Sequence, residues 1–126
     1  MPDENLAEWM RQGLISRGKA LDIGCGNARN SIFLARHGFT VDAVDYSASA
    51  IAWAQDEVAK AGVPVALRCA SVFELEIAAG SYDLVYDGGC FHHMAPHQRD
   101  AYIELVARAL KPGGALGLVC FRSEGG

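Results

Sequence analysis

The sequence predicts an α/β fold in which a mostly parallel sheet carries helices on both faces. Three observations support this prediction. Five short apolar runs alternate with segments that have helical hydrophobic spacing. Glycines and polar residues follow several of these runs, where ligands bind in such sheets. The length of 126 residues fits one domain, so we expect a single domain over residues 1–126.

The expected strands are apolar runs of strand length, each bounded by turn residues. They are Lys19–Ile23, Thr40–Val44, Val65–Cys69, Tyr82–Tyr86 and Ala115–Phe121. These runs and the helices between them define a core over residues 19–121.

Helical spacing of apolar residues predicts an amphipathic N-terminal helix over residues 3–17, on which Trp9 and Met10 read as core residues. A second helix is expected over Ser31–His37, followed by Gly38. Ser47 is a suitable N-cap for a third helix that ends at Gly62, and on this helix Trp53 is expected to pack.

The segment after Val72 fits either a short helix or an irregular turn. The last helix is expected over His97–Leu110 and ends at Lys111–Gly114. Its inward-facing residues are expected to be Ala101, Leu105, Val106 and Ala109.

Composition excludes several classes of protein. The net charge of −4 and the pI near 5.5 argue against a broad basic surface for nucleic acid. No apolar run reaches the roughly 18 residues of a membrane helix. The acidic N-terminus is unlike a signal peptide. We therefore expect a soluble cytoplasmic protein that binds neither nucleic acid nor membrane.

The cysteines indicate structural thiols. No two of the four form a C-x-x-C pair, which argues against a zinc knuckle or a redox pair. They lie in or near apolar runs, so we expect them to be reduced and buried. Cys25 and Cys90 stand among glycines, where either could face a ligand.

The first candidate site is the turn after the first expected strand, Leu21–Ala28. Gly24 and Gly26 allow a sharp turn and close approach of the backbone to a ligand. A plain strand-to-helix turn is the simpler alternative. A dinucleotide fingerprint requires a third glycine where Arg29 stands, which argues against a nicotinamide cofactor.

The second candidate is Asp45, which follows the second expected strand. It stands 21 residues after Gly24, the spacing at which an acidic residue accepts hydrogen bonds from ribose hydroxyls. Tyr46 beside it could cover an adenine face or pack on the next helix.

The third candidate is the segment Tyr86–Met94, in which Asp87 and two glycines precede His92 and His93. A zinc site needs three or four ligands of suitable spacing. These histidines and His97 lack an acidic or thiol partner at such a spacing, so we expect no metal site.

At this point a resemblance is clear. Five segments resemble, in this order, the motifs of class I S-adenosylmethionine-dependent methyltransferases: Ala20–Ala28, Asp45, Tyr82–Asp87, Phe91–Met94 and Leu110–Gly114. The resemblance covers residues 19–121. Arg29–Gly38 is similar, more weakly, to the thiopurine and tellurite-resistance subgroup.

The resemblance implies a Rossmann-like three-layer α/β/α sandwich with about five strands in the order 3-2-1-4-5. The family sheet has seven strands, and the last two have no counterpart here, so the fold is truncated. The fifth strand would then be an exposed apolar edge. A fragment of a longer enzyme, a homodimer through that edge, and a reduced module without catalysis all remain open. We favour a fragment that associates through the edge.

The resemblance also implies roles for matching residues. The turn at Gly24, Cys25 and Gly26 would contact the methionine half of S-adenosylmethionine, and Asp22 would help to hold its amino group. Asp45 would bind the ribose. The residues implied for the adenine are Tyr46, Ser71 and Val72, and those for the methionine end are Asp87 and Gly88. The family usually has aspartate where Ser71 stands, which predicts weaker selection of adenine.

The expected reaction is methyl transfer to a small-molecule acceptor by in-line attack on the sulfonium methyl group. An amine or hydroxyl acceptor needs a base, for which His92 and His93 are the local candidates. The alternatives are a non-catalytic module that binds S-adenosylmethionine or S-adenosylhomocysteine, an inactive fragment, and an NAD-dependent reductase.

Overall fold

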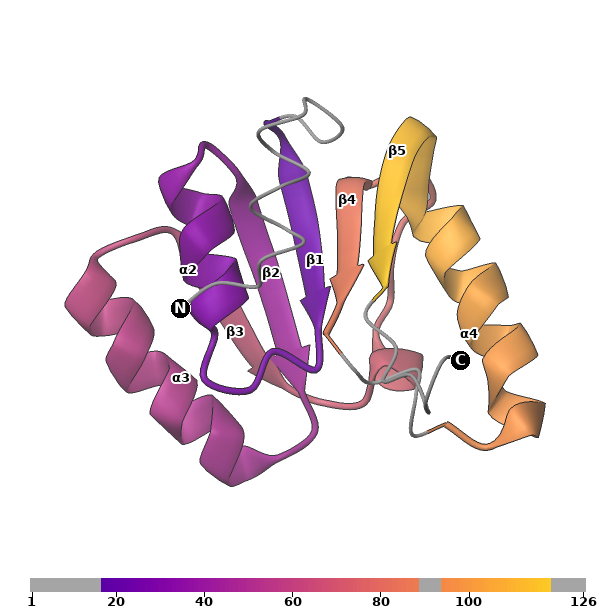
Figure 1. Cartoon of the computed structure of the whole chain (residues 1–126). Helices are drawn as coiled ribbons and strands as arrows, with labels where there is room; N and C mark the ends of the chain where they lie inside the picture. The colour runs from indigo at the N-terminus through magenta and orange to yellow at the C-terminus, as the bar shows by residue number, and fades with distance from the viewer. Residues whose placement is uncertain (1–16, 89–93, 119–126) are drawn as a thin grey trace, which may run out of the picture.

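The computed structural model describes residues 17–88 and 94–118 (Figure 1). Within these residues, five strands form one sheet in the order β3-β2-β1-β4-β5, and every neighbouring pair is parallel. The strands are β1 (Lys19–Ile23), β2 (Thr40–Asp45), β3 (Val65–Cys69), β4 (Tyr82–Asp87) and β5 (Leu110–Leu118). The expected fold class and strand order are confirmed.

Helices cover both faces of the sheet. The helical elements are α2 (Arg29–Arg36), α3 (Ala48–Ala61), the 3₁₀ turn η1 (Val72–Glu74) and α4 (Pro96–Ala109). Figure 1 shows α2 and α3 together on one side of the sheet and α4 on the other. The expected helix over residues 3–17, with Trp9 and Met10, lies outside the described residues.

The alternation of side chains along β1 builds two cores. Ala20 faces the α2 side and packs with Leu34 of α2. Leu21 and Ile23 face the other side and pack with residues such as Val106 of α4. Because both faces of the central strands are covered, their sequences read as nearly continuous apolar runs.

Local signals set the ends of α3 as predicted. The Ser47 hydroxyl accepts a hydrogen bond from the Ala50 amide at 3.2 Å, and this satisfies a free amide of the first turn. Gly62 ends the helix with φ of +66°, in the left-handed conformation that glycine adopts without a Cβ clash.

Some expectations about packing were wrong. On α4, Ala101 is exposed and Tyr102 is buried, so the inward-facing row runs through Tyr102, Leu105, Val106 and Ala109. The helix begins at Pro96 rather than His97, because proline suits the first helical position. Trp53 is 57% exposed and does not pack in the core. Cys69 is exposed, whereas Cys25 is buried as expected, and both are free thiols.

The fifth strand begins earlier than the expected Ala115. Leu110 pairs with Tyr82, and the next pair joins Ala115 to Leu84. Lys111 to Gly114 therefore lie outside the regular ladder between these pairs, which accommodates Pro112, a residue that has no backbone donor. The expected end at Phe121 lies outside the described residues.

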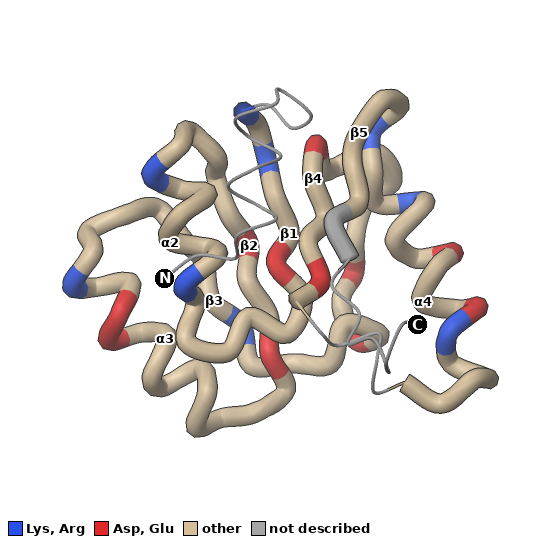
Figure 2. Tube along the Cα trace, in the orientation of Figure 1, with Lys and Arg blue, Asp and Glu red and all other residues tan. Residues whose placement is uncertain are grey.

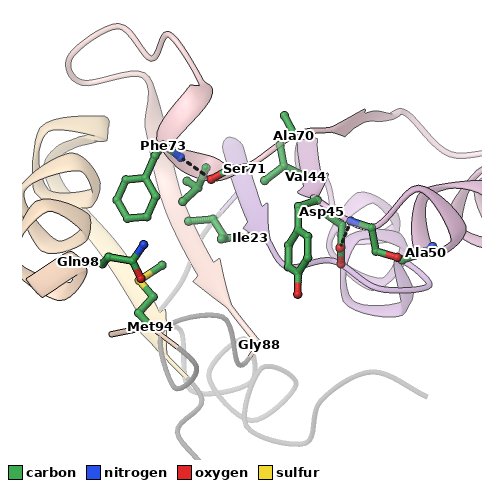
Figure 3. A pocket seen from close by; sticks show the side chains of 14 residues that line it. Ile23, Val44, Asp45, Ala50, Ala70, Ser71, Phe73, Gly88, Met94 and Gln98 are labelled. Carbon is green, nitrogen blue, oxygen red and sulfur yellow. Dashed lines mark hydrogen bonds between the residues drawn. The ribbon is translucent and has the colours of Figure 1, made fainter. Parts of the chain in front are cut away.

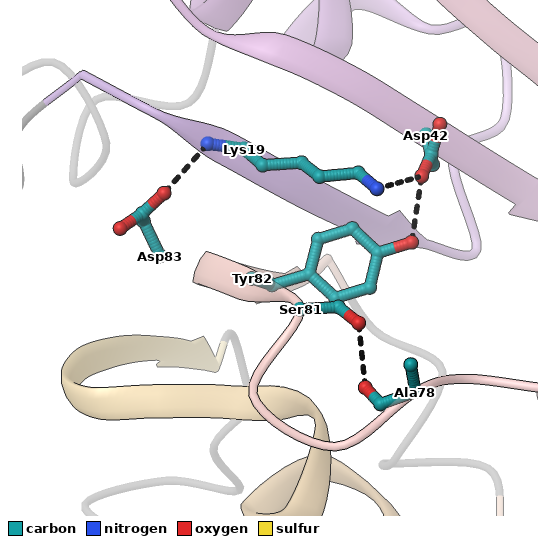
Figure 4. Close-up of polar contacts among 6 residues, drawn as sticks. All are labelled: Lys19, Asp42, Ala78, Ser81, Tyr82 and Asp83. Atoms are coloured by element: carbon teal, nitrogen blue, oxygen red, sulfur yellow. Dashed lines mark hydrogen bonds and ion pairs between the residues drawn. The ribbon is translucent and has the colours of Figure 1, made fainter.

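A polar cluster ties the first residues of the central strands together (Figure 4). The Tyr82 hydroxyl donates to Asp42 at 2.6 Å, and Lys19 lies 3.8 Å from the same carboxylate. Burial and the bond to Asp42 raise the pKa of the Tyr82 hydroxyl. The Asp83 carboxylate accepts the Lys19 amide at 2.8 Å, a bond that lowers the pKa of Asp83. This cluster joins β1, β2 and β4 at the end of the sheet away from the candidate site.

Two edges of the sheet have one neighbour each among the described residues. These are β3, paired with β2, and β5, paired with β4. In the described part of the chain, no helix has the length and apolar character needed to cross a membrane.

Candidate functional site

A cavity of about 580 Å³ lies at the carboxyl ends of the strands. It opens beside the ends of β1, β2 and β4, between the turn after β1 and the start of α4 (Figure 3). Its lining consists of Ile23, Gly24, Val44, Asp45, Tyr46, Ser47, Ala50, Ala70, Ser71, Val72, Phe73, Gly88, Met94 and Gln98. Acidic residues gather along the carboxyl-terminal parts of β1, β2 and β4 (Figure 2).

The turn after β1 is anchored to the end of β2. The amides of Gly24 and Cys25 both donate to the Val44 carbonyl oxygen, at 2.9 and 3.0 Å. Gly24 and Gly26 have φ of +70° and +55°, which explains glycine at both positions. Ala28 adopts φ of +68° directly before α2, an uncommon conformation for a residue with a Cβ. The chain thus presents backbone rather than side chains to the cavity at Gly24.

Asp45 joins this turn to the start of α3. One carboxylate oxygen accepts the Gly26 amide at 3.0 Å, and the other accepts the Ser47 amide at 2.9 Å. Two backbone donors therefore fix the orientation of the carboxylate at the cavity wall. Each oxygen keeps acceptor capacity for a further donor, such as a hydroxyl group.

Asp22 lies on β1 below the turn and is buried, with 2% exposure. The Ser31 hydroxyl on α2 donates to it at 2.6 Å. The pKa of Asp22 is raised to about 7, chiefly by burial and also by the charges of Asp87 and Asp45, while the bond from Ser31 acts in the opposite direction. Near neutral pH, a nearby cation would favour the ionised form.

Asp87 ends β4 and is fully buried, and the Tyr102 hydroxyl of α4 donates to it. Gly88 follows and lines the cavity. On the other side of the turn, burial raises the pKa of the Cys25 thiol to about 12. Cys25 therefore stays protonated and is a poor nucleophile.

The structure brings the predicted site residues to one place, in two layers. Six of the predicted residues line the cavity, namely Gly24, Asp45, Tyr46, Ser71, Val72 and Gly88. Asp22, Cys25, Gly26 and Asp87 support the wall from behind or beside it. His92 and His93 lie outside the described residues. Among the residues that are described, no group of three or more His, Cys, Asp or Glu side chains could hold a metal ion.

The lining also includes residues that sequence reasoning did not identify. Ser47 and Ala50 could have been found, because Ser47 is the predicted N-cap of the helix that follows Asp45 and Ala50 lies in its first turn. Phe73, Met94 and Gln98 come from η1 and the start of α4. No pattern in the sequence indicates that these segments meet.

Comparison with known proteins identifies the family. The family described as "Methyltransferase domain" matches residues 20–114. The chain belongs to this family. The matched residues of the methyltransferase domain include every described residue that the sequence pointed to for the site.

Two relatives show how far the similarity extends. An uncharacterized methyltransferase of Synechocystis sp. is 38% identical over 121 residues, covering 94% of this chain and 51% of the relative. The ribosomal RNA small subunit methyltransferase C of Alcanivorax borkumensis is 37% identical over 108 residues, which cover 83% of this chain and 33% of the relative. The methyltransferase domain thus spans about half or less of these relatives.

A solved structure shares the fold. The 1,6-didemethyltoxoflavin-N1-methyltransferase of Burkholderia thailandensis, solved with 1,6-didemethyltoxoflavin and S-adenosylhomocysteine bound, superposes with a TM-score of 0.83 at 24% identity. The superposition covers 97% of this chain and 53% of that one. The sheet and its helices therefore have the arrangement of a methyltransferase fold.

Proposed function

We propose that this methyltransferase domain binds S-adenosylmethionine in the cavity and transfers its methyl group to a small-molecule acceptor. The main support for this proposal is the position of Asp45 in a chain of this family. Asp45 is the last residue of β2, and its carboxylate lines the cavity. The backbone amides of Gly26 and Ser47 donate to this carboxylate and hold it in place. A carboxylate with free acceptor capacity there is suited to the two hydroxyls of a ribose.

The rest of the nucleoside fits around this anchor. Tyr46 is 80% exposed and lines the cavity, so its ring is available to cover an adenine face. Ser71 and Val72 line the side toward η1, and Ile23 adds apolar surface at the centre. These residues form an apolar slot beside a polar anchor, which is the composition expected for a nucleoside site.

The methionine half fits the end of the cavity at Gly24 and Gly88. Both positions lack a side chain, so the ligand can approach the backbone. The carboxyl groups of Asp22 and Asp87 lie behind this end, and a cation bound there would favour the ionised form of Asp22. The ligand carries a sulfonium and an ammonium group there, so the charges are complementary. The residues present therefore fit the cofactor.

The cofactor supplies an activated methyl group, and the chain has to hold it in line with the acceptor atom. The ordered turn at Gly24 and the fixed carboxylate of Asp45 provide this alignment. Proton removal from an amine or hydroxyl acceptor is assigned to His92 or His93 as part of the proposal. The net charge of −4 favours a small-molecule acceptor over RNA. We also propose that the protein acts in the cytoplasm.

Titration calorimetry with S-adenosylhomocysteine tests the binding step. The chain is expected to bind it at one site, and Asp45→Ala is expected to weaken binding at least tenfold. Asp56→Ala removes the same charge from an exposed position on α3 and should leave affinity unchanged. Equal affinity of Asp45→Ala and the parent protein would contradict the ribose assignment.

Methyl transfer is tested separately, with methyl-labelled S-adenosylmethionine and a panel of thiol, amine and hydroxyl acceptors. Label in any acceptor supports the enzyme. Binding without transfer to any of them supports the alternative of a non-catalytic binding module. With ribosomal RNA supplied as a further acceptor, label in the RNA and in no small molecule would overturn the small-molecule acceptor.

A further inference from the structure

The cavity has an end that the proposed ribose and methionine contacts leave unused. Phe73 of η1 meets Met94 and Gln98, which stand just before and within the first turns of α4, at this end (Figure 3). In the same view, Asp45 lies on the opposite side of the cavity, with Ile23 between them. A nucleoside anchored through its ribose at Asp45 would therefore direct the far edge of its base toward Phe73 and Gln98.

Gln98 is held in a defined orientation. Its side-chain carbonyl oxygen accepts the Ala95 backbone amide at 3.1 Å, as part of a helix cap. Because a backbone amide can only donate, this bond settles which end of the side chain is the oxygen. The NH₂ group is then free to donate, and the oxygen keeps a second lone pair. Among the described residues of the lining, Gln98 is the side chain that carries an amide group.

The side chains of Ser71 and Glu74 each make a hydrogen bond within the η1 segment itself. The Ser71 hydroxyl accepts the Phe73 amide at 3.3 Å, and the Glu74 carboxylate accepts the Ser71 amide at 2.8 Å. This capping box turns Ser71 and Glu74 toward the local backbone. A primary amide presents a donor and an acceptor side by side, which a single hydroxyl does not, so an amide from another element is better suited to a base edge.

Contacts of Tyr102 hold α4, the helix that carries Gln98, against η1 and β4. The rings of Phe73 and Tyr102 meet edge to face, with centroids 6.5 Å apart. The Tyr102 hydroxyl donates to Asp87 at the end of β4. These contacts fix the start of α4 against η1 and β4, so Gln98 needs little ordering when a ligand binds.

We propose that Gln98 reads the edge of the adenine base and determines the selectivity of the site for an adenine nucleoside. The inference rests on the proposed function. Adenine presents an amino donor beside a ring-nitrogen acceptor, and a primary amide matches this pair with its oxygen and its NH₂ group. Gln98 thus takes over the recognition that an aspartate at position 71 would provide.

The test compares S-adenosylhomocysteine with S-inosylhomocysteine by calorimetry. The inosine base replaces the amino donor by a carbonyl acceptor and the adjacent ring acceptor by an N–H donor. The parent protein is expected to prefer the adenine compound at least tenfold, as such amide pairs do. Gln98→Glu and Gln98→Ala are expected to reduce this preference to about threefold or less.

The glutamate variant separates the loss of the NH₂ donor from a loss of the helix cap. Glutamate at this position can still accept the Ala95 amide, so the helix cap is retained while the donor is lost. His97→Ala, on the neighbouring residue outside the lining, is the matched control and should keep the full preference. Circular dichroism confirms that each variant is folded.

The outcomes separate the two proposals. Asp45→Ala should weaken both compounds equally. An unchanged preference in Gln98→Glu and Gln98→Ala would overturn the role of Gln98 and leave the proposed function standing. The role of Gln98 is also overturned if either variant lowers the affinity for both compounds by the same factor. Failure of the parent protein to bind S-adenosylhomocysteine would overturn both proposals.

Discussion

Asp22 is a carboxyl group whose surroundings work against its ionisation. It is buried beneath the glycine turn, close enough to Asp87 and Asp45 for their charges to oppose its own. The bond from Ser31 opposes these effects without cancelling them. At the residue scale, the fold keeps a carboxyl group poised near neutral pH beside a cavity, an arrangement common at functional sites.

This raised pKa predicts a pH-dependent stability. Between the unfolded value of 3.8 and the folded value of about 7, the folded state holds a proton that the unfolded chain has released. The free energy of unfolding should therefore fall as pH rises through this window. Asp22→Asn has no titrating group at this position, so its free energy of unfolding should decrease less with pH than that of the parent protein. Urea denaturation at several pH values measures this difference. Asp56→Asn, exposed on α3, should keep the parent slope, and identical slopes in all three proteins would refute the assignment.

Gly18 and Gly62 both have positive φ, but an added side chain would meet different surroundings at the two positions. A Cβ at Gly18 would lie 2.1 Å from a carboxylate oxygen of Asp83. That oxygen accepts the Lys19 amide and lies 3.3 Å from the Lys111 ammonium, so displacing it breaks both contacts. A Cβ at Gly62 would meet open space.

We therefore expect Gly18→Ala to lower the free energy of unfolding by about 2 kcal/mol. Gly62→Ala should lower it by about 1 kcal/mol, the cost of a left-handed alanine alone. Chemical denaturation measures both values. A larger loss in Gly62→Ala than in Gly18→Ala would show that the contact with Asp83 is unimportant.

At the scale of elements, α3 depends on a cap that also borders the site. The Ser47 hydroxyl caps the helix, and its backbone amide orients Asp45. The first contact needs the side chain and the second does not. Cap and carboxylate can therefore be perturbed independently.

Ser47→Ala should destabilise the protein by about 1 kcal/mol through loss of the cap. Its effect on S-adenosylhomocysteine affinity should be less than threefold, because the backbone bond to Asp45 remains. Thermal and chemical denaturation give the first value and calorimetry the second. Ser47→Asp, which restores an N-cap acceptor, should recover the stability, and a failure to do so would argue that the hydroxyl acts in another way.

At the scale of the whole molecule, the edge of β5 is the main unpartnered feature. The strand runs over Leu110–Leu118 and pairs with β4 alone among the described residues. Leu116 is 41% exposed there. An unpaired strand edge with apolar side chains favours pairing with another strand.

We propose that two copies of the chain associate through this edge. Light scattering over a range of concentrations should show a dimer, and Leu116→Lys should shift it toward monomer, because charge on an edge opposes pairing. Ile103→Lys, on exposed α4, is the matched control and should leave the dimer intact. A monomer at every concentration would exclude this association.

Strand ends and spacing in the sequence located the site, and the resemblance of its motifs to class I methyltransferases supplied the order of the sheet. Apolar runs and caps are local signals, and parallel strands joined by helices leave few topologies. The glycine turn and Asp45 follow their strands directly, so strand direction alone brings them to one edge. Of the six predicted lining residues, Ser71 and Val72 came from the resemblance to the family, and the other four followed from strand ends and spacing.

Only the tertiary structure decided which residues complete the cavity and how the helices face the core. Ala101 and Tyr102 both suit an amphipathic helix, and the position of β4 determines that Tyr102 turns inward to reach Asp87. Trp53 is apolar, yet no element lies opposite it in the described fold. Phe73 and Gln98 meet because η1 and α4 pack on the same face of the sheet. Periodicity identifies the face of an element, whereas its partner depends on contacts between segments distant in the chain.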